Sequence, residues 1–424
     1  MPAMFFEPRL LLPVFFAGAC GVASDVVDTP AFPDGGLLAR ATPLGGEILE
    51  KLRGNYTVAS DDEDFPSSSV WNSTAETVSF FATRNASYGI LRAGCLEDGE
   101  RLVLEGVWRF GVAPRTGLMR LFVQPDATAR ALCAGESPTE SPRLAGDMGL
   151  NSVLPDQPIT FTFERPPVET GGFVVVAHRG GCRTSDACGA SENSLPVLRM
   201  AESLGADAVE IDVQLTRDGV PIVYHDATFT NRLTRGAYCH GAVSDFTLAH
   251  VRALCTLTFG EAVPTLAEAL TTAIDDTRLE GIWLDVKTPE TVAPVLGILR
   301  EAEAYAASRG RNIHFVFGLW SDELIDAYVA ASPPSGTRCL VELEPRELWN
   351  ANCRIWAPRW TLGPMRERVE RVQGIGGNVI FWTLDEPKII DAILEEAQPN
   401  AVLTNRPGVV RHRFQTHGQA VMTP

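Results

Sequence analysis

The chain has 424 residues, and its 45% hydrophobic and 21% charged residues are typical of globular proteins, so wholesale disorder is excluded. It contains 36 Lys and Arg against 53 Asp and Glu, a formal net charge of -17, which disfavours binding to nucleic acid and non-specific adhesion to anionic membranes. Because a chain of this length exceeds one ordinary small domain, we expect two domains.

The first 20 residues have the order of a secretory signal peptide. Arg9 precedes a short apolar run at residues 10–16, and small residues follow it. The run is much shorter than the ~20 apolar residues that a membrane-spanning helix needs. It ends at Cys20, and AGAC resembles the lipobox of bacterial lipoproteins. We therefore expect an exported protein, either a lipoprotein attached to the membrane through lipidated Cys20 or a secreted protein, with a linker at residues 21–44.

Eight cysteines remain besides Cys20, an even number that suits an exported, oxidised protein. Many pairings are open, but the spacing favours neighbours along the chain: Cys95 with Cys133, Cys182 with Cys188, Cys239 with Cys255, and Cys339 with Cys353. If the protein is secreted by a eukaryote, Asn55, Asn72 and Asn85 are candidate glycosylation sites, since each begins an N-x-S/T triplet.

Residues 45–168 contain short alternating segments separated by turns, which predict a β-rich accessory domain, either an antiparallel sandwich or a small barrel. We find no cluster of His, Cys and acidic residues with catalytic spacing there, and expect this domain to space or support the second one. Prolines and glycines at residues 166–172 mark the joint.

Residues 172–414 alternate strand and helix signals, as in the helix-like segments 194–205 and 386–397. The candidate strands are residues 173–177, 208–213, 281–286, 313–318, 338–343, 354–358, 378–384 and 401–405. Eight such repeats predict an α/β fold, a (β/α)8 TIM barrel preceded by the smaller, mostly β domain. Chemistry is then expected at the carboxyl ends of the strands.

The second candidate strand carries two acids on one face. Alternation places aliphatic side chains on one side of the segment AVEIDV and puts Glu210 and Asp212 together on the other. Adjacent carboxylates repel each other unless positive charge lies between them, and hard divalent cations prefer oxygen ligands. Asp285 and Lys287 share a face at the end of the third strand. The sequence therefore predicts a metal site at this end of the barrel.

Other polar residues follow the same strand ends. His178 and Arg179 end the first strand, Glu192 follows in the next loop, and His225 lies between the second and third strands. Each of these residues alone has a structural alternative, such as a histidine hydrogen-bonded in the core or a lysine paired with a local acid. Trp382, at the end of the seventh strand, is predicted either to pack in the core or to form an apolar wall beside a substrate.

Six motifs in this order resemble the glycerophosphodiester phosphodiesterase family, and the resemblance covers roughly residues 173–410. The motifs are HRG (178–180), EN (192–193), EIDVQLTRDGVPIVYHD (210–226), LDVK (284–287), WTLD (382–385) and TNRP (404–407). The long central motif is specific, whereas HRG and EN alone are common.

The resemblance implies hydrolysis of glycerophosphodiesters, such as glycerophosphocholine, to sn-glycerol 3-phosphate and an alcohol. It implies that a divalent cation, Ca²⁺ or Mg²⁺, is bound by three acids, that two histidines act as general acid and base, and that two cations hold phosphate oxygens. The three acids are Glu210, Asp212 and Asp285. The two histidines are His178 and His225, and the two cations are Arg179 and Lys287. The resemblance also implies that Glu192 belongs to the site, either near the metal or towards the glycerol hydroxyls. Histidine suits the role because imidazole titrates near neutral pH.

Two departures from the family leave alternatives open. The family usually has Glu where this chain has Asp285, and ordinary members lack the cysteines at 182 and 188. Both features are similar to spider-venom-type phospholipases D, so the second prediction is phospholipase D-like cleavage of lysophospholipids or sphingomyelin. A third is a non-catalytic surface binding module. The expected partner is a small-molecule or lipid-derived phosphodiester.

Overall fold

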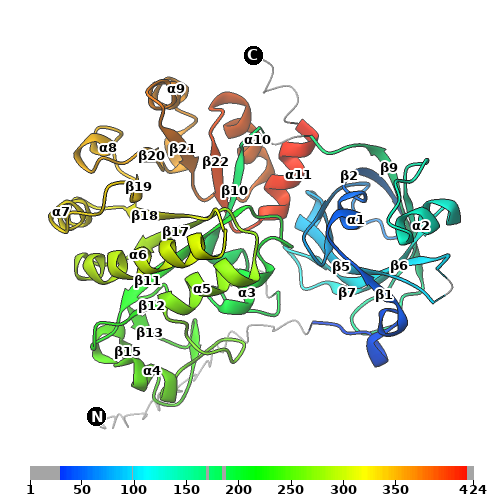
Figure 1. The fold of residues 1–424 in the computed structure, drawn as a ribbon, viewed down its shortest axis with the longest axis horizontal. Helices are drawn as coiled ribbons and strands as arrows, with labels where there is room; N and C mark the ends of the chain where they lie inside the picture. The colour runs from blue at the N-terminus through cyan, green and yellow to red at the C-terminus, as the bar shows by residue number, and fades with distance from the viewer. Residues whose placement is uncertain (1–28, 98, 169–170, 184–187, 418–424) are drawn as a thin grey trace, which may run out of the picture.

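The computed structural model describes residues 29–417, apart from residues 98, 169–170 and 184–187. The predicted signal segment and Cys20 therefore lie outside the described residues. None of the helices in the described part combines the length and the apolar character that crossing a membrane requires. The described chain forms an antiparallel and a parallel β-barrel that lie side by side (Figure 1).

The antiparallel barrel is formed by consecutive strands of the chain, β2 to β9, in which each strand pairs with the next and β9 pairs with β2. The strands are β1 (Thr42–Leu44), β2 (Gly54–Ser60), β3 (Ser68–Ser73), β4 (Val78–Phe81), β5 (Ser87–Cys95), β6 (Leu102–Phe110), β7 (Thr116–Gln124), β8 (Arg143–Met148) and β9 (Gln157–Arg165). The short strand β1 pairs with β5, and helices α1 (Glu47–Glu50) and α2 (Asp126–Cys133) complete this part. Of the two predicted architectures, the small barrel is the one formed.

Aromatic side chains fill the interior of the antiparallel barrel. Trp71 and Phe161 have ring centroids 5.0 Å apart, and Phe80 and Trp108 belong to the same buried cluster. An eight-stranded barrel is just wide enough for side chains to fill it. The interior is therefore a hydrophobic core.

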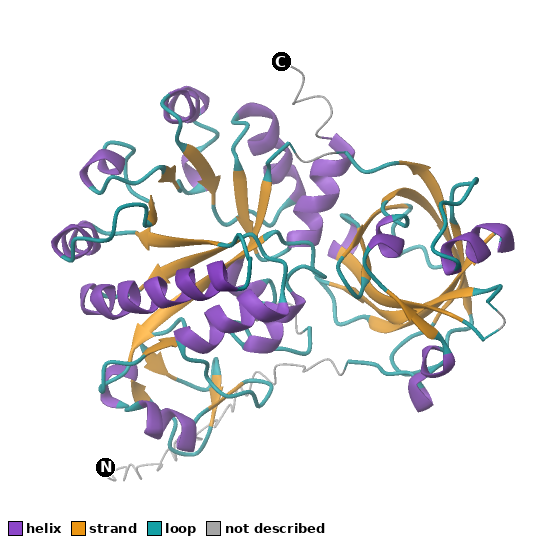
Figure 2. Cartoon of the chain, viewed as in Figure 1, coloured by secondary structure: helices purple, strands orange, loops and turns teal. Residues whose placement is uncertain are grey.

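The parallel barrel is closed because β10 pairs with both β11 and β22. Its strands are β10 (Val174–Ala177), β11 (Ala208–Leu215), β17 (Gly281–Val286), β18 (His314–Leu319), β19 (Arg338–Val341), β20 (Ile355–Trp356), β21 (Asn378–Phe381) and β22 (Ala401–Thr404). The surrounding helices are α3 (Leu195–Met200), α5 (Leu266–Asp276), α6 (Val292–Ser308), α7 (Asp322–Ala330), α8 (Glu347–Asn350), α9 (Arg366–Gly374), α10 (Pro387–Glu396) and α11 (Pro407–His417). Figure 2 shows these helices outside the strands, which confirms the predicted fold class.

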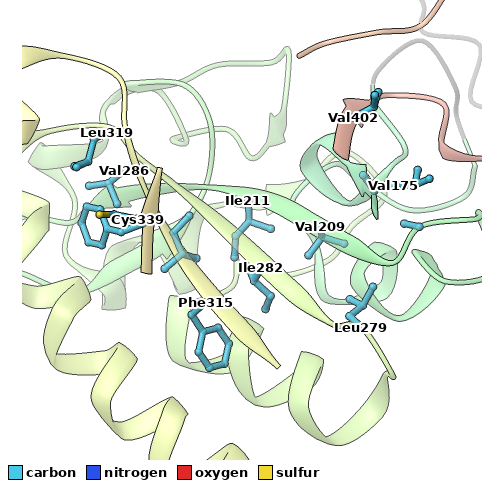
Figure 3. Packing of buried hydrophobic residues seen from close by; sticks show 14 of the residues in the cluster. Val175, Val209, Ile211, Leu279, Ile282, Val286, Phe315, Leu319, Cys339 and Val402 are labelled. Atoms are coloured by element: carbon cyan, nitrogen blue, oxygen red, sulfur yellow. The ribbon is translucent and has the colours of Figure 1, made fainter. Parts of the chain in front are cut away.

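The outer faces of the parallel strands supply the main hydrophobic core. Val209 and Ile211 of β11 are fully buried beside Ile282 of β17 and Phe315 of β18 (Figure 3). Because side chains alternate along a strand, Glu210 and Asp212 are directed to the other face of β11, toward the inside of the barrel. The packing of the aliphatic face thus fixes the direction of the two acids.

An excursion between β11 and β17 has a small core of its own. It contains β12 (Pro221–Val223), which pairs antiparallel with β11, and then β13 (Thr228–Phe229), β14 (Thr234–Arg235), β15 (Gly241–Ala242), α4 (Leu248–Leu254) and β16 (Thr256–Leu257). The Cys239–Cys255 disulfide lies in its hydrophobic cluster. Together these elements support the segment that carries His225.

The predicted pairing of neighbouring cysteines is confirmed. Among the described residues, the disulfides are Cys95–Cys133, Cys182–Cys188, Cys239–Cys255 and Cys339–Cys353. Such crosslinks stabilise proteins mainly by restricting the unfolded chain. They are typical of proteins in oxidising compartments, which supports an extracellular location.

The two barrels meet through a shared apolar cluster. Phe81 and Tyr88 of the antiparallel barrel pack with Val197 and with the Cys182–Cys188 disulfide of the parallel barrel. A Cβ atom at Gly408, at the start of α11, would lie 2.4 Å from Phe81, so the contact leaves no room for a side chain there. The antiparallel barrel is therefore packed closely against the loop that follows His178.

Phe81→Ala should lower the free energy of unfolding by about 3 kcal/mol, because it removes a fully buried ring and leaves a cavity between the barrels. Urea denaturation followed by circular dichroism measures the change. Val112→Ala is the control, since Val112 is 50% exposed in the same barrel, and its effect should stay below about 0.5 kcal/mol. Equal urea concentrations at the unfolding midpoint for Phe81→Ala and the wild type would contradict the packing of Phe81 between the barrels.

Candidate active site

Three carboxylates converge at the carboxyl ends of β11 and β17. Parallel pairing places Asp212 directly beside Asp285, and Glu210 lies two residues earlier on the same face of β11. One oxygen from each of these acids lies within 4.8 Å of the others. The predicted acidic site is thus assembled by strand register.

Two cations lie among these acids. Lys287 Nζ is 2.6 Å from Asp212 Oδ1 and 2.5 Å from Asp285 Oδ2. Arg179 Nη1 is 2.7 Å from Glu192 Oε1, and its Nε is 3.4 Å from Asp212 Oδ2. Both cations therefore already face carboxylates.

The carboxylates carry more negative charge than their surroundings offset. Burial raises the pKa of Glu210 well above its usual value, and the charges of Asp212 and Asp285 raise it further. Burial likewise raises the pKa of Asp285, despite the charge of Lys287. Burial acts in the same direction on Asp212, but the charges of Lys287 and Arg179 outweigh it and lower the pKa of Asp212. Such a cluster has room for further positive charge.

The donor set suits a hard divalent cation. Glu210 Oε1 and Asp285 Oδ1 are buried, and neither has a hydrogen-bond partner among the described residues. The other oxygen of Glu210 accepts a hydrogen bond from the backbone N–H of Arg179, at 3.0 Å, and Asn193 Nδ2 donates to Asp212 Oδ2 at 2.7 Å. These bonds orient the carboxylates and leave oxygens for a metal ion, as Ca²⁺ and Mg²⁺ require.

Each of the two histidines has one ring nitrogen in a hydrogen bond. His178 Nδ1 is 2.7 Å from Asn405 Oδ1, and the amide nitrogen of Asn405 donates to Asp385, which turns its oxygen toward the histidine. His225 Nδ1 is 2.7 Å from Asp226 Oδ1. In both rings, Nδ1–H is the donor and Nε2 is left for proton exchange with a ligand.

The site opens into a cavity of about 620 Å³. Its lining includes seven of the predicted site residues, namely His178, Arg179, Glu210, His225, Asp285, Lys287 and Trp382. Glu192 is buried behind Arg179, and Asp212 is buried beneath Lys287. The structure thus brings every predicted site residue to one end of the parallel barrel, in the lining or directly behind it.

Some residues of the site were not predicted from the sequence. Asn193 and Asn405 lie in the motifs EN and TNRP, and Asp226 follows His225. The sequence therefore indicated where these residues lie, but not that their hydrogen bonds orient Asp212, His178 and His225. Glu342 follows β19 and Arg359 follows β20, and both line the cavity. The only sequence signal for these two was their place at strand ends: Glu342 is the second-last residue of the candidate strand 338–343, and Arg359 follows the candidate strand 354–358.

Burial raises the pKa of Glu342 to about 8, and the charge of Asp285 adds to the shift. A carboxyl whose pKa is raised in the folded state stabilises the protein fully below its unfolded value of 4.5 and loses that contribution as the pH rises through about 8. Glu342→Gln should therefore gain melting temperature relative to the wild type between pH 5 and pH 8, about the span between these two values. Thermal denaturation of chelator-treated protein measures this difference, and a difference independent of pH would contradict the assignment.

Comparisons with known proteins bear on this site. Residues 178–317 match the model of the glycerophosphoryl diester phosphodiesterase family. The chain is 27% identical over 269 residues to the probable glycerophosphodiester phosphodiesterase 2 of Mycobacterium tuberculosis, covering 59% of this chain and 93% of that protein. It is 42% identical over 101 residues to the glycerophosphodiester phosphodiesterase of Caldanaerobacter subterraneus subsp. tengcongensis, covering 22% of this chain and 38% of that relative.

Among solved structures, the chain is similar to an Oleispira antarctica phosphodiesterase in complex with the product sn-glycerol-3-phosphate. The two are 22% identical, with a TM-score of 0.46, and the match covers 56% of this chain and 95% of that protein. The family match spans both histidines and all three carboxylates of the site. It confirms the resemblance in the sequence: residues 178–317, in the parallel barrel, match the glycerophosphoryl diester phosphodiesterase family, a class of phosphoric diester hydrolases.

Proposed function

We propose that the protein hydrolyses glycerophosphodiesters, such as glycerophosphocholine, to sn-glycerol 3-phosphate and an alcohol, with a divalent cation, Ca²⁺ or Mg²⁺, as cofactor. The observation that carries the proposal is the meeting of three carboxylates, two of them buried and one half-buried, and two oriented histidines at one cavity. Glu210, Asp212 and Asp285 would hold the cation, which when bound supplies positive charge to offset that of the phosphoryl oxygens.

The histidines would transfer the protons of the reaction. The attacking hydroxyl loses a proton as its bond to phosphorus forms, and the leaving oxygen gains one as its bond breaks. Burial and the charge of Arg179 lower the pKa of His178 to about 4, so this ring is neutral near pH 7 and its Nε2 can accept the first proton. His225, whose orientation Asp226 fixes, would give a proton to the leaving oxygen.

Other predicted residues would position the substrate. Arg179 and Lys287 line the cavity beside the acids, where their charges favour a phosphate. Glu192 would hold Arg179 in place through their 2.7 Å ion pair. Trp382 lines the cavity, which supports its role as an apolar wall against the glycerol.

We further propose that the antiparallel barrel supports the catalytic one. Thr77 and Ser203 hydroxyl oxygens lie 2.9 Å apart, and Thr83 Oγ1 lies 2.8 Å from His412 Nδ1, so polar contacts accompany the shared apolar cluster. An exported location fits the four disulfides of the described chain. Attachment through lipidated Cys20 remains part of this proposal.

One observation favours a second reaction. Trp320 and Leu362 line the cavity although they are 42% and 61% exposed. Exposed apolar side chains beside a site favour binding of an apolar group, since burying both surfaces removes them from water. The second candidate is therefore phospholipase D-like cleavage of a lysophospholipid or sphingomyelin.

The two reactions differ in substrate and product. Purified protein with Ca²⁺ or Mg²⁺ should release sn-glycerol 3-phosphate from glycerophosphocholine, and a chelator should abolish the release because the buried acids then lack their cation. Enzymatic detection of sn-glycerol 3-phosphate and of choline measures both products. Choline released from lysophosphatidylcholine alone would favour the second candidate, and inertness toward both substrates would contradict the proposal.

His225→Ala should lower kcat by at least about a hundredfold, because it removes the proton donor to the leaving oxygen. The far-ultraviolet circular dichroism spectrum should match that of the wild type. His250→Ala is the matched control, since His250 is an exposed histidine on α4, and its kcat should be unchanged. An unaltered rate in His225→Ala would refute the acid assignment.

Asp285→Asn should weaken Ca²⁺ or Mg²⁺ binding about tenfold or more, because it replaces a charged oxygen ligand by a neutral amide. Isothermal titration calorimetry measures the affinity without any turnover. Asp275→Asn is the control, since Asp275 lies on α5 and pairs with Arg309 away from the cavity. Equal affinities of the Asp285 variant and the wild type would exclude Asp285 as a ligand.

A further inference from the structure

The cations beside the acidic cluster are largely offset by carboxylates. Among the described side chains there, five carboxylates face three cations, a formal charge of -2. The carboxylates are Glu192, Glu210, Asp212, Asp226 and Asp285, and the cations are Arg179, Arg232 and Lys287. A bound divalent cation would bring this group only to neutrality. A phosphodiester, which is itself an anion, therefore needs positive charge from another part of the cavity.

Arg359 offers such a charge. It follows β20 at the carboxyl end of the barrel, its side chain is exposed, and it lines the same cavity as His178 and Lys287. Within the described chain, its guanidinium forms no ion pair or hydrogen bond with a carboxylate. Its charge lowers the pKa of Glu342, which Asp285 raises, so Glu342 lies within electrostatic range of both the arginine and the acids.

The guanidinium is held by an aromatic face. Its central carbon lies 4.6 Å from the centroid of the Trp382 ring, within the range of a cation–π contact. The indole is fixed in turn, because Trp382 Nε1 donates to the backbone oxygen of Ala357 at 2.7 Å. Stacking leaves the N–H groups at the edge of the guanidinium available, and a preorganised arginine loses less conformational entropy when it binds an anion.

We propose that Arg359, stacked on Trp382, binds the non-bridging phosphoryl oxygens of the substrate. Arginine suits this role because its planar fork of N–H donors matches two phosphate oxygens. The inference rests on the proposed phosphodiesterase function and adds a substrate-binding residue that the family motifs found in the sequence do not include. An anionic group on the leaving alcohol would attract Arg359 in the same way as the phosphoryl group does. The test must therefore distinguish binding of the phosphoryl group from binding of the alcohol.

Arg359→Gln should raise KM about tenfold or more for both glycerophosphocholine and glycerophosphoserine, because both contain the same phosphodiester. It should also weaken the binding of inorganic phosphate to the metal-loaded protein by a similar factor in isothermal titration calorimetry. Arg359→Lys keeps the charge but loses the fork, and should give intermediate values. Arg354→Gln is the matched control, since Arg354 is an exposed arginine at the opposite end of β20, and it should behave as the wild type.

Three results would overturn the inference. One is an unchanged phosphate affinity in Arg359→Gln. The second is a KM increase confined to glycerophosphoserine, which would assign Arg359 to the carboxylate of the alcohol. The third is a lower melting temperature with unchanged KM, which would make Arg359 a packing partner of Trp382. If the wild type hydrolyses neither diester, the proposed function fails, whereas phosphate titration of the wild type and the variant still tests Arg359.

Discussion

Repulsion among the carboxylates of Glu210, Asp212 and Asp285 is the constraint that shapes this site. The acids cannot move apart, because the register of β11 and β17 sets their spacing and both strands are packed into the barrel core. Burial makes the repulsion stronger, since water no longer screens it. The ion pairs of Lys287 and the raised pKa of Glu210 are both consequences of this enforced proximity.

The acids and the histidines of the site are held in position in two different ways. The acids are on strands, whose position the hydrophobic core determines. His178 and His225 follow strand ends, and each is fixed by a hydrogen bond to Nδ1. Disulfides near both segments restrict the chain further, Cys182–Cys188 beside the loop after His178 and Cys239–Cys255 in the excursion after His225. Flexible connections would otherwise leave the two imidazoles poorly placed relative to the acids.

The sequence predicted those features that depend on the alternation of side chains along strands or on short separations between residues. Strand alternation separates Val209 and Ile211 from Glu210 and Asp212, and the eight strand signals sufficed to predict the parallel barrel, which the structure confirms. Short separations between cysteines likewise sufficed for the disulfides. Arg359 was not predicted, because a single exposed arginine after a two-residue strand has no pattern that distinguishes it from other surface arginines.

The cavity has two sides with different electrostatic character. On one side, Arg179 and Lys287 are close to carboxylates, so their charges mainly stabilise the acidic cluster. On the other side, Arg359 contacts an aromatic ring, which holds a cation without neutralising it. Arg359 can therefore add to the positive charge that a bound cation, Arg179 and Lys287 offer the phosphoryl oxygens on the first side. A phosphodiester held between the two sides would keep its reacting bond near the histidines.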